Sequence, residues 1–481
     1  MDGAQVRASG CGRRQGEFMT FDSIVLAAGK GTRMKSSISK VLHDFAGRKI
    51  VYFPVRAALE CGATRAIVVC SPDNRESIAR YLEAEFGKDR IVCVVQTEQL
   101  GTGDAARAGM IACQSEQVCL LCGDTPLVDA AGLELFTASD GKPAFSVMSC
   151  HLDDPTGYGR ILRDGERRVV AIREQRDASS EERRVTEVNA GIYFGDTAAL
   201  RGALAALRCD NDQKEYYLTD VVAILSRTSQ VEARLGSPDT LLGINDREQL
   251  EVAEQKMLST IRTRHRRDGV TVRGDARIED AVEIGRDSVI ESGVQLRGKT
   301  QVGSGTHIDV GSVLTNVTVG SNAQIRPYTT MTECELGNAV QIGPYAHLRP
   351  GSIIEDEAHI GNFVETKKTR MRRGAKANHL AYLGDGDVGE KANIGAGTIF
   401  CNYDGYRKHQ TTIGAGAFIG SDSQLVAPVE IGSGAYVATG TTVTSDVPDD
   451  AVAIGRTPQV NKPGSAARLR RRLAAAVGKK A

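Results

Sequence analysis

The chain has 481 residues, which is too long for one ordinary hydrophobic core and predicts at least two domains. Its 60 basic and 60 acidic residues balance, which argues against a general nucleic-acid binder or a binder of anionic membranes, because both need a net basic surface. Tryptophan is absent and glycine is abundant at 52 residues, which indicates many tight turns.

The eleven cysteines are scattered and mostly lie in apolar stretches, which is typical of a protein from a reducing cytoplasm. Cys119 and Cys122 form a CxxC pair, but the surrounding "VCLLCGD" predicts a buried strand, so packed thiols are favoured over a redox or zinc site. Residues 1–18 are polar and glycine-rich, so we expect a disordered extension rather than a signal peptide, with Met19 as an alternative start. No apolar stretch is long enough to predict a membrane span.

Residues 19–245 are predicted to form a nucleotide-binding domain with a Rossmann-like α/β fold. The strand-length apolar runs are "SIVLAAG", "AIVVCS", "IVCVVQ", "VCLLCGD" and "PAFSVMSC", and amphipathic stretches such as "VYFPVRAALECG" and "GDAARAGMIACQ" lie between them. This alternation predicts a parallel sheet with helices on both faces. Ligands of such sheets bind at the carboxyl ends of the strands.

The pattern changes after Asn245. Residues 246–268 have helical spacing and high charge, which predicts a connecting helix. Residues 269–462 then carry an apolar residue at every sixth position, with two one-residue shifts and one irregular stretch. These positions are Ile278, Ile284, Ile290, Leu296, Val302, Ile308, Leu314, Val319, Ile325, Met331, Leu336, Ile342, Leu348, Ile354, Ile360, Ile413, Ile419, Leu425, Ile431, Val437 and Val443.

This period predicts a solenoid in which one aliphatic side chain per short strand points inward. Three strands make a triangular coil, and about ten coils of about eighteen residues bury a continuous column. A sandwich of short strands is the alternative, but its strands would alternate with period two over longer runs. The repeat resembles the left-handed parallel β-helix of hexapeptide-repeat acyltransferases, and the resemblance alone implies the handedness. Residues 463–481 are basic and are expected to be a solvated tail, either a short helix or disordered.

The densest motif is "LAAGKGTRMKSSISKVLH", which begins at Leu26 and contains Arg33 and Lys40. Glycines let backbone N–H groups close on phosphate oxygens, and two cations can neutralise a triphosphate. A short glycine pair alone usually marks a tight turn, and the string is neither a P-loop nor a dinucleotide loop. The full string, however, resembles the signature of sugar-nucleotide pyrophosphorylases.

This resemblance implies attack by a sugar-1-phosphate oxygen on the α-phosphorus of UTP, with release of pyrophosphate. Positioning and charge neutralisation by Mg²⁺, Arg33 and Lys40 would carry the rate. The implied nucleotide site consists of Leu26, Ala27, Ala28, Gly29, Lys40, Gln96, Gly101 and Thr102. A glutamine amide can pair with the edge of uracil.

Asp124 stands at a predicted strand end, where a hard oxygen ligand can hold Mg²⁺, although a lone aspartate there is more often a turn cap. The resemblance implies that Asp124 and Asn245 hold this metal. It implies a sugar-phosphate site of Gly159, Glu174, Asn189 and Asn245. Two positions depart from the family: Ser39 replaces a usual proline, and Asp104 replaces a histidine of a close relative.

The six-residue period breaks from Phe363 to Gln410, where the sequence is polar. Such interruptions of a solenoid tend to build its binding face, although a charged surface loop is the plain alternative. The strings "NHLAYLGD", "NIGAGT" and "CNYDG" resemble one family, the bacterial bifunctional N-acetylglucosamine-1-phosphate uridylyltransferase and glucosamine-1-phosphate N-acetyltransferase. This resemblance runs in order from about Phe21 to Pro463.

Acetyl transfer from acetyl-CoA needs a neutral amine as nucleophile, so a general base must take its proton, and histidine suits that task. We expect His379 to be this base and Glu365 to hold either His379 or the sugar. The resemblance implies an amino-sugar phosphate site of Arg349, Lys367, Tyr382, Asn393 and Lys408. It implies an acetyl-CoA site of Ala396, Asn402, Tyr403, Ser421, Thr439 and Arg456, where Thr439 replaces an alanine of a familiar relative.

The resemblance also implies a cytoplasmic homotrimer that makes UDP-N-acetylglucosamine for peptidoglycan and lipopolysaccharide precursors. The expected partners are UTP, acetyl-CoA, glucosamine-1-phosphate and N-acetylglucosamine-1-phosphate, with no nucleic acid and no membrane. One alternative is a single-activity nucleotidyltransferase whose β-helix serves oligomerisation or allostery, and "NHLAYLGD" with "NYDG" argues against it. Another is a non-catalytic assembly subunit, which could lose the cations and metal ligands that this chain retains.

Overall fold

The structure, a computed structural model, describes residues 20–138, 145–240 and 243–477. The chain divides into two compact units, Met1–Ser259 and Thr260–Ala481. The extension expected at residues 1–18 and the alternative start at Met19 lie outside the described residues. Within the described ranges, no helix combines the length and apolar character that a membrane crossing requires.

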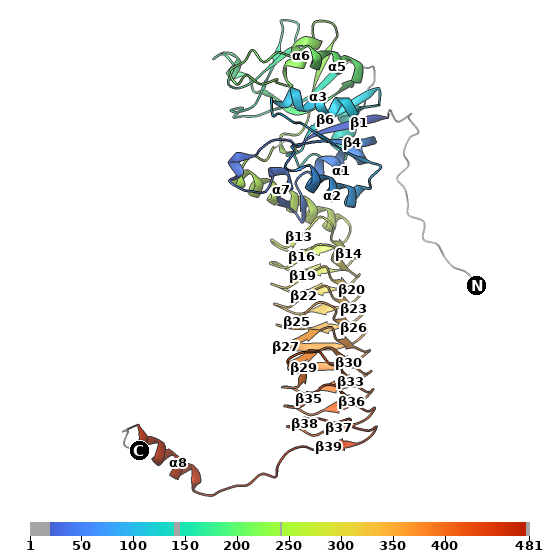
Figure 1. Ribbon diagram of the computed structural model, residues 1–481, viewed down its shortest axis with the longest axis vertical. Helices are drawn as coiled ribbons and strands as arrows, with labels where there is room; N and C mark the ends of the chain where they lie inside the picture. Colours follow the sequence, from blue (N-terminus) through green and yellow to red (C-terminus); the bar gives the residue numbers. More distant parts are fainter. Residues whose placement is uncertain (1–19, 139–144, 241–242, 478–481) are drawn as a thin grey trace, which may run out of the picture. The chain divides into compact units, whose positions relative to one another are not determined.

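The first unit is built around a mixed nine-stranded sheet (Figure 1). Its main path has the order β11-β7-β10-β6-β1-β4-β5, and β8 and β9 form a hairpin beside β10. The strands are β1 Phe21–Leu26, β4 Ala63–Cys70, β5 Ile91–Val95, β6 Gln117–Cys122, β7 Phe145–His151, β8 Arg160–Arg163, β9 Val169–Arg173, β10 Glu187–Asp196 and β11 Val231–Leu235, and a small separate ribbon consists of β2 Asp44–Phe45 and β3 Arg48–Lys49.

The prediction of a parallel sheet is wrong for two strands, β9 and β10, which run in the direction opposite to the others. β6, β1, β4 and β5 run parallel, and the five strand-like runs named from the sequence are confirmed as β1, β4, β5, β6 and β7. β10 runs antiparallel to both β6 and β7. The β8–β9 hairpin, rather than a crossover helix, connects β7 to β10, and antiparallel neighbours need no crossover helix.

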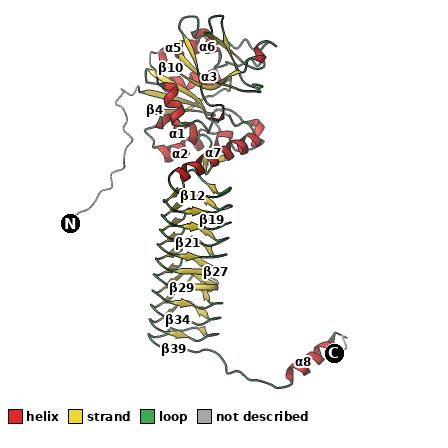
Figure 2. Ribbon diagram, turned by 180° about the vertical axis from the view of Figure 1, so that it is seen from behind, coloured by secondary structure: helices red, strands yellow, loops and turns green. Residues whose placement is uncertain are grey.

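Helices cover both faces of this sheet (Figure 2), because alternate residues of each strand point to opposite sides. One face packs Val25 and Val68 against α1, α2 and α4, and the other packs Ile24 and Ile67 against α3, α5 and α6. The helices are α1 Tyr52–Glu60, α2 Arg75–Phe86, α3 Thr102–Ala112, α4 Ala130–Thr137, α5 Thr197–Ala205 and α6 Asp220–Leu225, with short 3₁₀ helices at Thr32–Met34, Lys40–Leu42, Glu182–Arg184 and Pro238–Thr240.

The charged stretch after Asn245 forms one long helix, α7 Arg247–Arg267, and the division between the two units falls within it. The basic C-terminal segment contains a second isolated helix, α8 Ser465–Ala476, and none of its residues is buried.

The second unit is a parallel β-helix whose strands follow one another in chain order along the stack (Figure 1). The β-helix has three faces. Face A consists of the first parts of β27 and β29 together with β12, β15, β18, β21, β24, β31, β34, β37 and β39, and face B consists of the second parts of β27 and β29 together with β13, β16, β19, β22, β25, β32, β35 and β38. Face C is a nine-stranded sheet of β14, β17, β20, β23, β26, β28, β30, β33 and β36. Nine face-C strands and a final partial coil agree with the expected ten or so coils.

The strands of the β-helix are mostly two or three residues long. Their bounds are β12 Thr271–Val272, β13 Arg277–Ile278, β14 Glu283–Ile284, β15 Val289–Ile290, β16 Gln295–Arg297, β17 Gln301–Val302, β18 His307–Ile308, β19 Val313–Thr315, β20 Thr318–Val319, β21 Gln324–Ile325, β22 Thr330–Thr332, β23 Glu335–Leu336, β24 Gln341–Ile342, β25 His347–Leu348, β26 Ile353–Ile354, β27 His359–Lys367, β28 Arg370–Met371, β29 Lys376–Gly384, β30 Gly386–Val388, β31 Asn393–Ile394, β32 Ile399–Cys401, β33 Thr411–Ile413, β34 Phe418–Ile419, β35 Gln424–Val426, β36 Val429–Ile431, β37 Tyr436–Val437, β38 Thr442–Val443 and β39 Val452–Ala453. β27 and β29 are longer because each continues from face A around the corner into face B.

The aliphatic column predicted from the six-residue period is confirmed. Every predicted inward residue is buried except Ile284 in the first coil, which is half-buried. At the two corners where the period shortens, Asn316 (φ 53°) and Glu333 (φ 48°) take the left-handed conformation that the tighter corner requires.

The prediction that the column breaks from Phe363 to Gln410 is wrong for most of that stretch. The column continues through Thr366, Met371, Ala377, Leu383, Val388, Ile394 and Phe400, none of which is more than 3% exposed. The period is hidden in the sequence because a threonine and an alanine fill two of these inward positions. The chain leaves the coil at residues 402–410, between β32 and β33.

Candidate active sites in the two units

The glycine-rich loop that follows β1 is held by two side-chain amides, of which Asn74 is buried and Gln99 is partly exposed. Asn74 donates from Nδ2 to the carbonyl of Ala27 and to Ser39 Oγ, both at 3.0 Å, and its Oδ1 accepts from the Ser71 amide. Gln99 donates to the carbonyl of Ala28 at 2.6 Å. The hydrogen bond from Asn74 therefore holds Ser39 at the position where the family usually has a rigid proline.

Two cations and two oxygen ligands converge from distant parts of the first unit. Arg33 Nη2 donates to Asn245 Oδ1 at 2.9 Å, and Lys40 Nζ donates to the same oxygen at 3.4 Å. Lys40 also forms an ion pair with Asp124, whose carbonyl accepts from the amide of Ile244. Of the sequence-predicted residues, these four are brought together.

The same cluster fits a Mg²⁺ ion. The Asp124 carboxylate and the Asn245 amide oxygen both accept from the Lys40 ammonium, so two hard oxygens already point at one cation. Mg²⁺ commonly takes one or two such protein oxygens and keeps waters or phosphate oxygens in its other positions. Among the described residues, no group of three histidine, cysteine or acidic side chains forms an alternative metal centre.

The loop from Gln96 to Thr102, which contains the glutamine expected to pair with uracil, surrounds the buried side chain of Gln96. Gln96 Nε2 donates to the carbonyl of Gly101 at 3.1 Å and to Asp104 Oδ2 at 2.8 Å. A Cβ on Gly101 would lie 2.6 Å from the carbonyl oxygen of Tyr216, so glycine is required for this packing. Thr102 Oγ1 accepts from the amide of Leu218, so it also contacts the segment that follows Tyr216.

Three of the predicted sugar-phosphate residues lie side by side. A Cβ on Gly159 would be 3.6 Å from Glu174 Oε1 and 3.7 Å from the Cβ of Asn189, so the glycine lies beside both. The same Cβ would lie only 2.9 Å from Ile172 Cγ2, so the position is tightly packed. Burial raises the pKa of the Glu174 carboxyl, although the Thr219 hydroxyl donates to it at 3.0 Å. Asn189 donates to the Tyr193 hydroxyl, which fixes its amide. The fourth predicted residue, Asn245, belongs to the cation cluster described above.

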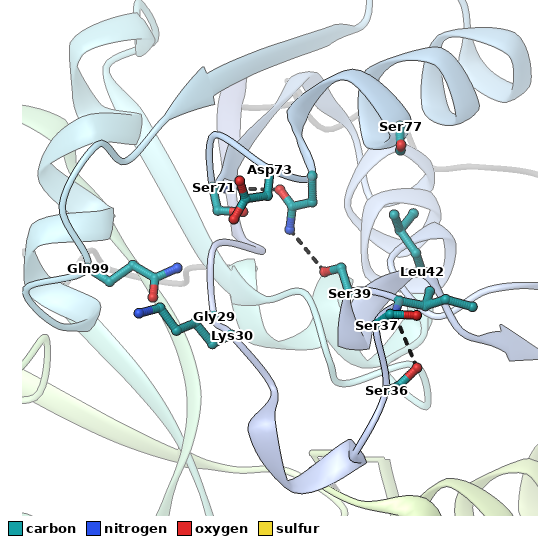
Figure 3. Close-up of a pocket in the computed structure, with 12 residues that line it drawn as sticks. Gly29, Lys30, Ser36, Ser37, Ser39, Leu42, Ser71, Asp73, Ser77 and Gln99 are labelled. Carbon is teal, nitrogen blue, oxygen red and sulfur yellow. Dashed lines mark hydrogen bonds between the residues drawn. The ribbon is translucent and has the colours of Figure 1, made fainter.

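A polar cavity of about 360 Å³ opens beside the glycine-rich loop. Lys30 and Gln99 lie together on one side of it, and Ser36, Ser37 and Ser39 lie on the other (Figure 3). Gly29 also lines this cavity, so part of the predicted nucleotide loop faces an open space.

In the β-helix, the predicted base His379 is exposed and paired with Asn362. The two residues are opposite each other in the β27–β29 ladder, and His379 Nδ1 lies 2.9 Å from Asn362 Oδ1. An amide oxygen only accepts, so Nδ1 carries the proton in this contact and Nε2 keeps its lone pair. Of the two roles expected for Glu365, that of holding His379 is wrong, because Glu365 accepts from Arg349 at 2.8 Å and the partner of His379 is Asn362.

His379 stands in a row of residues along the edge where face A meets face B, which we call the A/B edge. Successive coils place Asn362, His379, Ala396, Ser421 and Thr439 in this row. The glycines before Ala396 and Ser421 allow the close approach, since a Cβ on Gly395 or Gly420 would lie 2.5 Å from the amide nitrogen of the residue in the next coil, Ser421 or Thr439. Arg456 Nη1 donates to the carbonyl of Thr439 at 2.9 Å.

Face B carries a polar patch. Strand register places Arg349 and Lys367 on neighbouring coils, and Glu365 opposite Tyr382 on the next. The Tyr382 hydroxyl and Asn402 Nδ2 approach the same point, at 2.5 and 2.6 Å from where a Cβ on Gly384 would lie. Asn402 is 4% exposed and donates to Asp385 Oδ2 at 2.5 Å.

The remaining predicted residues lie elsewhere on the coil. Tyr403 and Lys408 belong to residues 402–410, between face B and face C, where Lys408 Nζ lies 4.3 Å above the Tyr403 ring. Asp404 organises this loop: its pKa is lowered by the amide of Arg407, by His409 and by a further backbone N–H. Asn393 lies on face A. One chain therefore does not bring all the predicted acetyl-CoA residues to one edge.

An exposed ladder of rings runs along the A/B edge beside His379. Tyr328, Tyr345 and Phe363 stack at centroid distances of 5.3 and 5.6 Å, and each is at least half exposed. Leu380, which follows His379, is 61% exposed at the equivalent position of the next coil. Exposed apolar surface of this kind, rimmed by polar residues, is typical of interaction sites.

The CxxC pair has the structural role expected for it. Cys119 is fully buried in the sheet, and burial raises the pKa of Cys122 to about 12. Every cysteine among the described residues is free.

Sequence reasoning missed Asn74 and Asn362, and it recognised Asp104 only as a departure from a relative. Asn362 could have been predicted from the sequence, because it lies seventeen residues before His379, which is close to the length of one coil. Asn74 carries no such signal, because its partners Ala27 and Ser39 are 47 and 35 positions away. Asp104 is only eight positions from Gln96, but no repeat relates the two residues.

Comparisons with known proteins agree with this two-part arrangement. A family model described as a MobA-like NTP transferase domain matches residues 23–185, and the model of bacterial transferase hexapeptide repeats matches residues 333–368 and 410–445, which assigns the β-helix to the left-handed hexapeptide class. The chain is 54% identical to "Bifunctional protein GlmU" of Sorangium cellulosum over 459 residues, covering 94% of this chain and 97% of that protein. Proteins of the same name from Trichlorobacter lovleyi and Anaeromyxobacter sp. are 44% and 46% identical, covering 92% and 93% of this chain and 97% and 92% of their own lengths.

Proposed function

Because the chain belongs to the family of bifunctional GlmU proteins, it is a two-part transferase, and we propose which residues perform each reaction. The second unit acetylates glucosamine-1-phosphate with acetyl-CoA, and the first transfers UMP from UTP to the resulting N-acetylglucosamine-1-phosphate. The observation that carries this function is the match with bifunctional relatives over both units, from one end of the described chain almost to the other.

In the first unit, a phosphate oxygen of N-acetylglucosamine-1-phosphate attacks the α-phosphorus of UTP. A bond forms between that oxygen and phosphorus, the bond from the α-phosphorus to the bridging oxygen breaks, and pyrophosphate leaves. Arg33 and Lys40 neutralise the phosphates, and Gly159, Glu174 and Asn189 hold the sugar. Asp124 and Asn245 would hold a Mg²⁺ ion, which would supply further charge neutralisation when bound. The loop of Leu26, Ala27, Ala28 and Gly29 carries the nucleotide together with Gln96, Gly101 and Thr102.

The metal assignment has a direct test. Asp124→Asn keeps the size of the side chain but removes its charge, so the Mg²⁺ concentration that gives half-maximal uridylyl transfer should rise at least about tenfold. Acetyl transfer in the same sample should not change and serves as the folding control. An unaltered Mg²⁺ dependence in the variant would contradict the assignment.

In the second unit, His379 Nε2 takes a proton from the amine of glucosamine-1-phosphate as the nitrogen attacks the thioester carbon. The carbon–nitrogen bond forms, the carbon–sulfur bond breaks and CoA leaves as the thiol. Asn362 supports this role because it accepts from Nδ1–H and leaves the Nε2 lone pair free. Arg349, Lys367 and Tyr382 on face B hold the sugar phosphate, with Asn393 and Lys408.

We further propose a homotrimer in which acetyl-CoA lies between neighbouring β-helices. Two observations support it. The stacked rings of Tyr328, Tyr345 and Phe363 expose apolar surface that a neighbouring β-helix would bury. The predicted acetyl-CoA residues lie at two different edges of one chain. Ala396, Ser421, Thr439 and Arg456 lie at the A/B edge, whereas Asn402 and Tyr403 lie toward face C, so neighbouring copies complete one site.

The proposed location is the cytoplasm, where free thiols such as those of this chain persist. There the product, UDP-N-acetylglucosamine, would supply precursors of peptidoglycan and lipopolysaccharide. We propose no nucleic-acid or membrane partner, because the chain has balanced charge.

A coupled assay tests the whole proposal. Glucosamine-1-phosphate, acetyl-CoA, UTP and Mg²⁺ are supplied together, and free thiol, pyrophosphate and UDP-N-acetylglucosamine are measured. The proposal expects all three products. Pyrophosphate from N-acetylglucosamine-1-phosphate without thiol release would instead favour the single-activity nucleotidyltransferase, and absence of all three would favour the non-catalytic subunit.

A further inference from the structure

We propose that Asp104 is a specificity-determining residue that makes the first unit select UTP over CTP. It does so through Gln96, by fixing the side-chain amide so that an oxygen acceptor, rather than an N–H donor, faces the base. This inference rests on the proposed function, in which Gln96 reads the edge of the nucleotide base.

The orientation of the Gln96 amide follows from its two partners. Gln96 Nε2 carries two hydrogens, and it lies 2.8 Å from Asp104 Oδ2 and 3.1 Å from the carbonyl oxygen of Gly101. A carboxylate and a backbone carbonyl accept hydrogen bonds and cannot donate them. Turning the amide over would place Oε1 against two acceptors, so this environment excludes the other orientation.

The surroundings leave little freedom for another arrangement. Gln96 is 4% exposed, and its backbone amide donates to the carbonyl of Cys70 at the end of β4. Asp104 lies in the first turn of α3, where the helix dipole favours a negative charge. Within residues 20–138, 145–240 and 243–477, no group donates to Gln96 Oε1, so this oxygen remains for a ligand.

The free oxygen discriminates between pyrimidines by the group at ring position 3. Uracil carries an N–H there and can donate to Oε1. Cytosine carries an unprotonated nitrogen there, so its lone pair would face the lone pairs of Oε1 and both acceptors would lose a partner. Asp104 thus determines which base can form a hydrogen bond with Gln96, although it does not contact the base itself.

An amide at position 104 removes this constraint. Asparagine can turn either its oxygen or its NH₂ group toward Gln96, so both orientations of the Gln96 amide become satisfied. We therefore expect Asp104→Asn to accept CTP better and to discriminate less, rather than simply to lose activity.

The experiment compares kcat/KM for UTP and for CTP, with N-acetylglucosamine-1-phosphate and Mg²⁺, in the full-length protein. Asp104→Asn should lower the UTP/CTP ratio at least about tenfold, the effect of an unsatisfied buried polar group. Gln96→Ala should lower it similarly. Glu116→Gln removes an exposed carboxylate elsewhere in the unit and should leave the ratio unchanged.

The ratio separates specificity from general damage, because a purely structural role of Asp104 would lower both rate constants together. Equilibrium binding of UTP and CTP by calorimetry gives the same ratio if a variant loses turnover, and acetyl transfer verifies folding of the second unit. If Gln96→Ala lowers the ratio and Asp104→Asn does not, the inference is wrong while the base-reading role stands. If neither lowers it, both assignments are wrong, and failure of the unmodified protein to use UTP would contradict the proposed function itself.

Discussion

The two units assemble their candidate sites in opposite ways. In the first unit, Arg33 reaches Asn245, a residue 212 positions away in the sequence. In the second, Asn362 and His379 are 17 positions apart, and Arg349 and Glu365 are 16 apart. In the solenoid, residues about one coil apart in the sequence become neighbours in the structure. In the α/β unit, the residues of the site lie at the ends of different strands and come together only after the whole sheet has formed.

This difference has energetic consequences that mutations can test. Each coil of a solenoid contacts its neighbours, so damage to one coil should act on the sites stacked beside it. The cation cluster of the first unit depends on several loops at once. Changes in one unit should therefore leave the reaction of the other unit measurable, and the paired activities provide an internal control.

The largest expected effect is the loss of acetyl transfer in His379→Ala. Removing a general base lowers the rate by about 10²–10⁴-fold, and uridylyl transfer should be unchanged. Arg33→Ala should produce the reverse pattern, because the arginine contacts the cluster of the first unit. Both rates are measured on each variant by thiol release and by pyrophosphate release. Loss of both activities, or of neither, in His379→Ala would reject its role as the base.

The next effect concerns the close stacking of the coils that carry Asn362 and His379. A Cβ on Gly361 would lie 1.8 Å from the carbonyl oxygen of Asn378, which is backbone and cannot rotate away. Gly361→Ala should lower the free energy of unfolding of the second unit by about 3 kcal/mol, the upper end for overpacking, and reduce acetyl transfer.

Thermal unfolding followed together with both activities measures this effect. Gly202→Ala is the matched control, because nothing lies within 4 Å of the added Cβ and the site is in helix α5 of the first unit. Equal melting temperatures of Gly361→Ala and the parent protein would show that the coils can move apart without loss of stability.

A smaller effect is expected when the neutral partner of His379 is replaced by an acid. The carboxylate of Asn362→Asp would favour the protonated imidazole, so less free base is available at neutral pH. The rising limb of the pH profile of acetyl transfer should move upward by about one pH unit. Asn362→Ala should lower the rate without this displacement. A profile that does not move in Asn362→Asp would indicate that Asn362 and His379 are not in contact during turnover.

The smallest effect is a change in stability at the sugar site of the first unit. Burial raises the pKa of Glu174 above its ordinary value of 4.5, so folding favours the protonated carboxyl. The stability contributed by this group is complete below pH 4.5 and is lost as the pH rises through the raised pKa. Glu174→Gln stays neutral, so its melting temperature should exceed that of the parent by a few degrees at pH 8 and match it at pH 4, while uridylyl transfer falls. A constant difference between the two proteins at both pH values would contradict this account of the carboxyl.

The sequence predicted the β-helix nearly residue by residue, but it mistook the stretch from Phe363 to Gln410 for an interruption. The error arose where the inward residues are Thr366 and Ala377 rather than large aliphatic residues. In the first unit, the sequence predicted five of the nine strands of the sheet and the phosphate loop, but not the antiparallel direction of β9 and β10. Strand direction depends on the path of the connection, and the β8–β9 hairpin that sets it has no strong local signal.

By itself, the sequence determined the two architectures, because hydrophobic period is a local property that each segment carries independently of the rest. Only the tertiary structure decided the pairing of polar groups, such as Asn362 with His379, Arg349 with Glu365, and Asp104 with Gln96. Hydrogen bonds depend on tenths of an ångström and on the direction of each donor, and these are fixed only when separate segments have packed against one another.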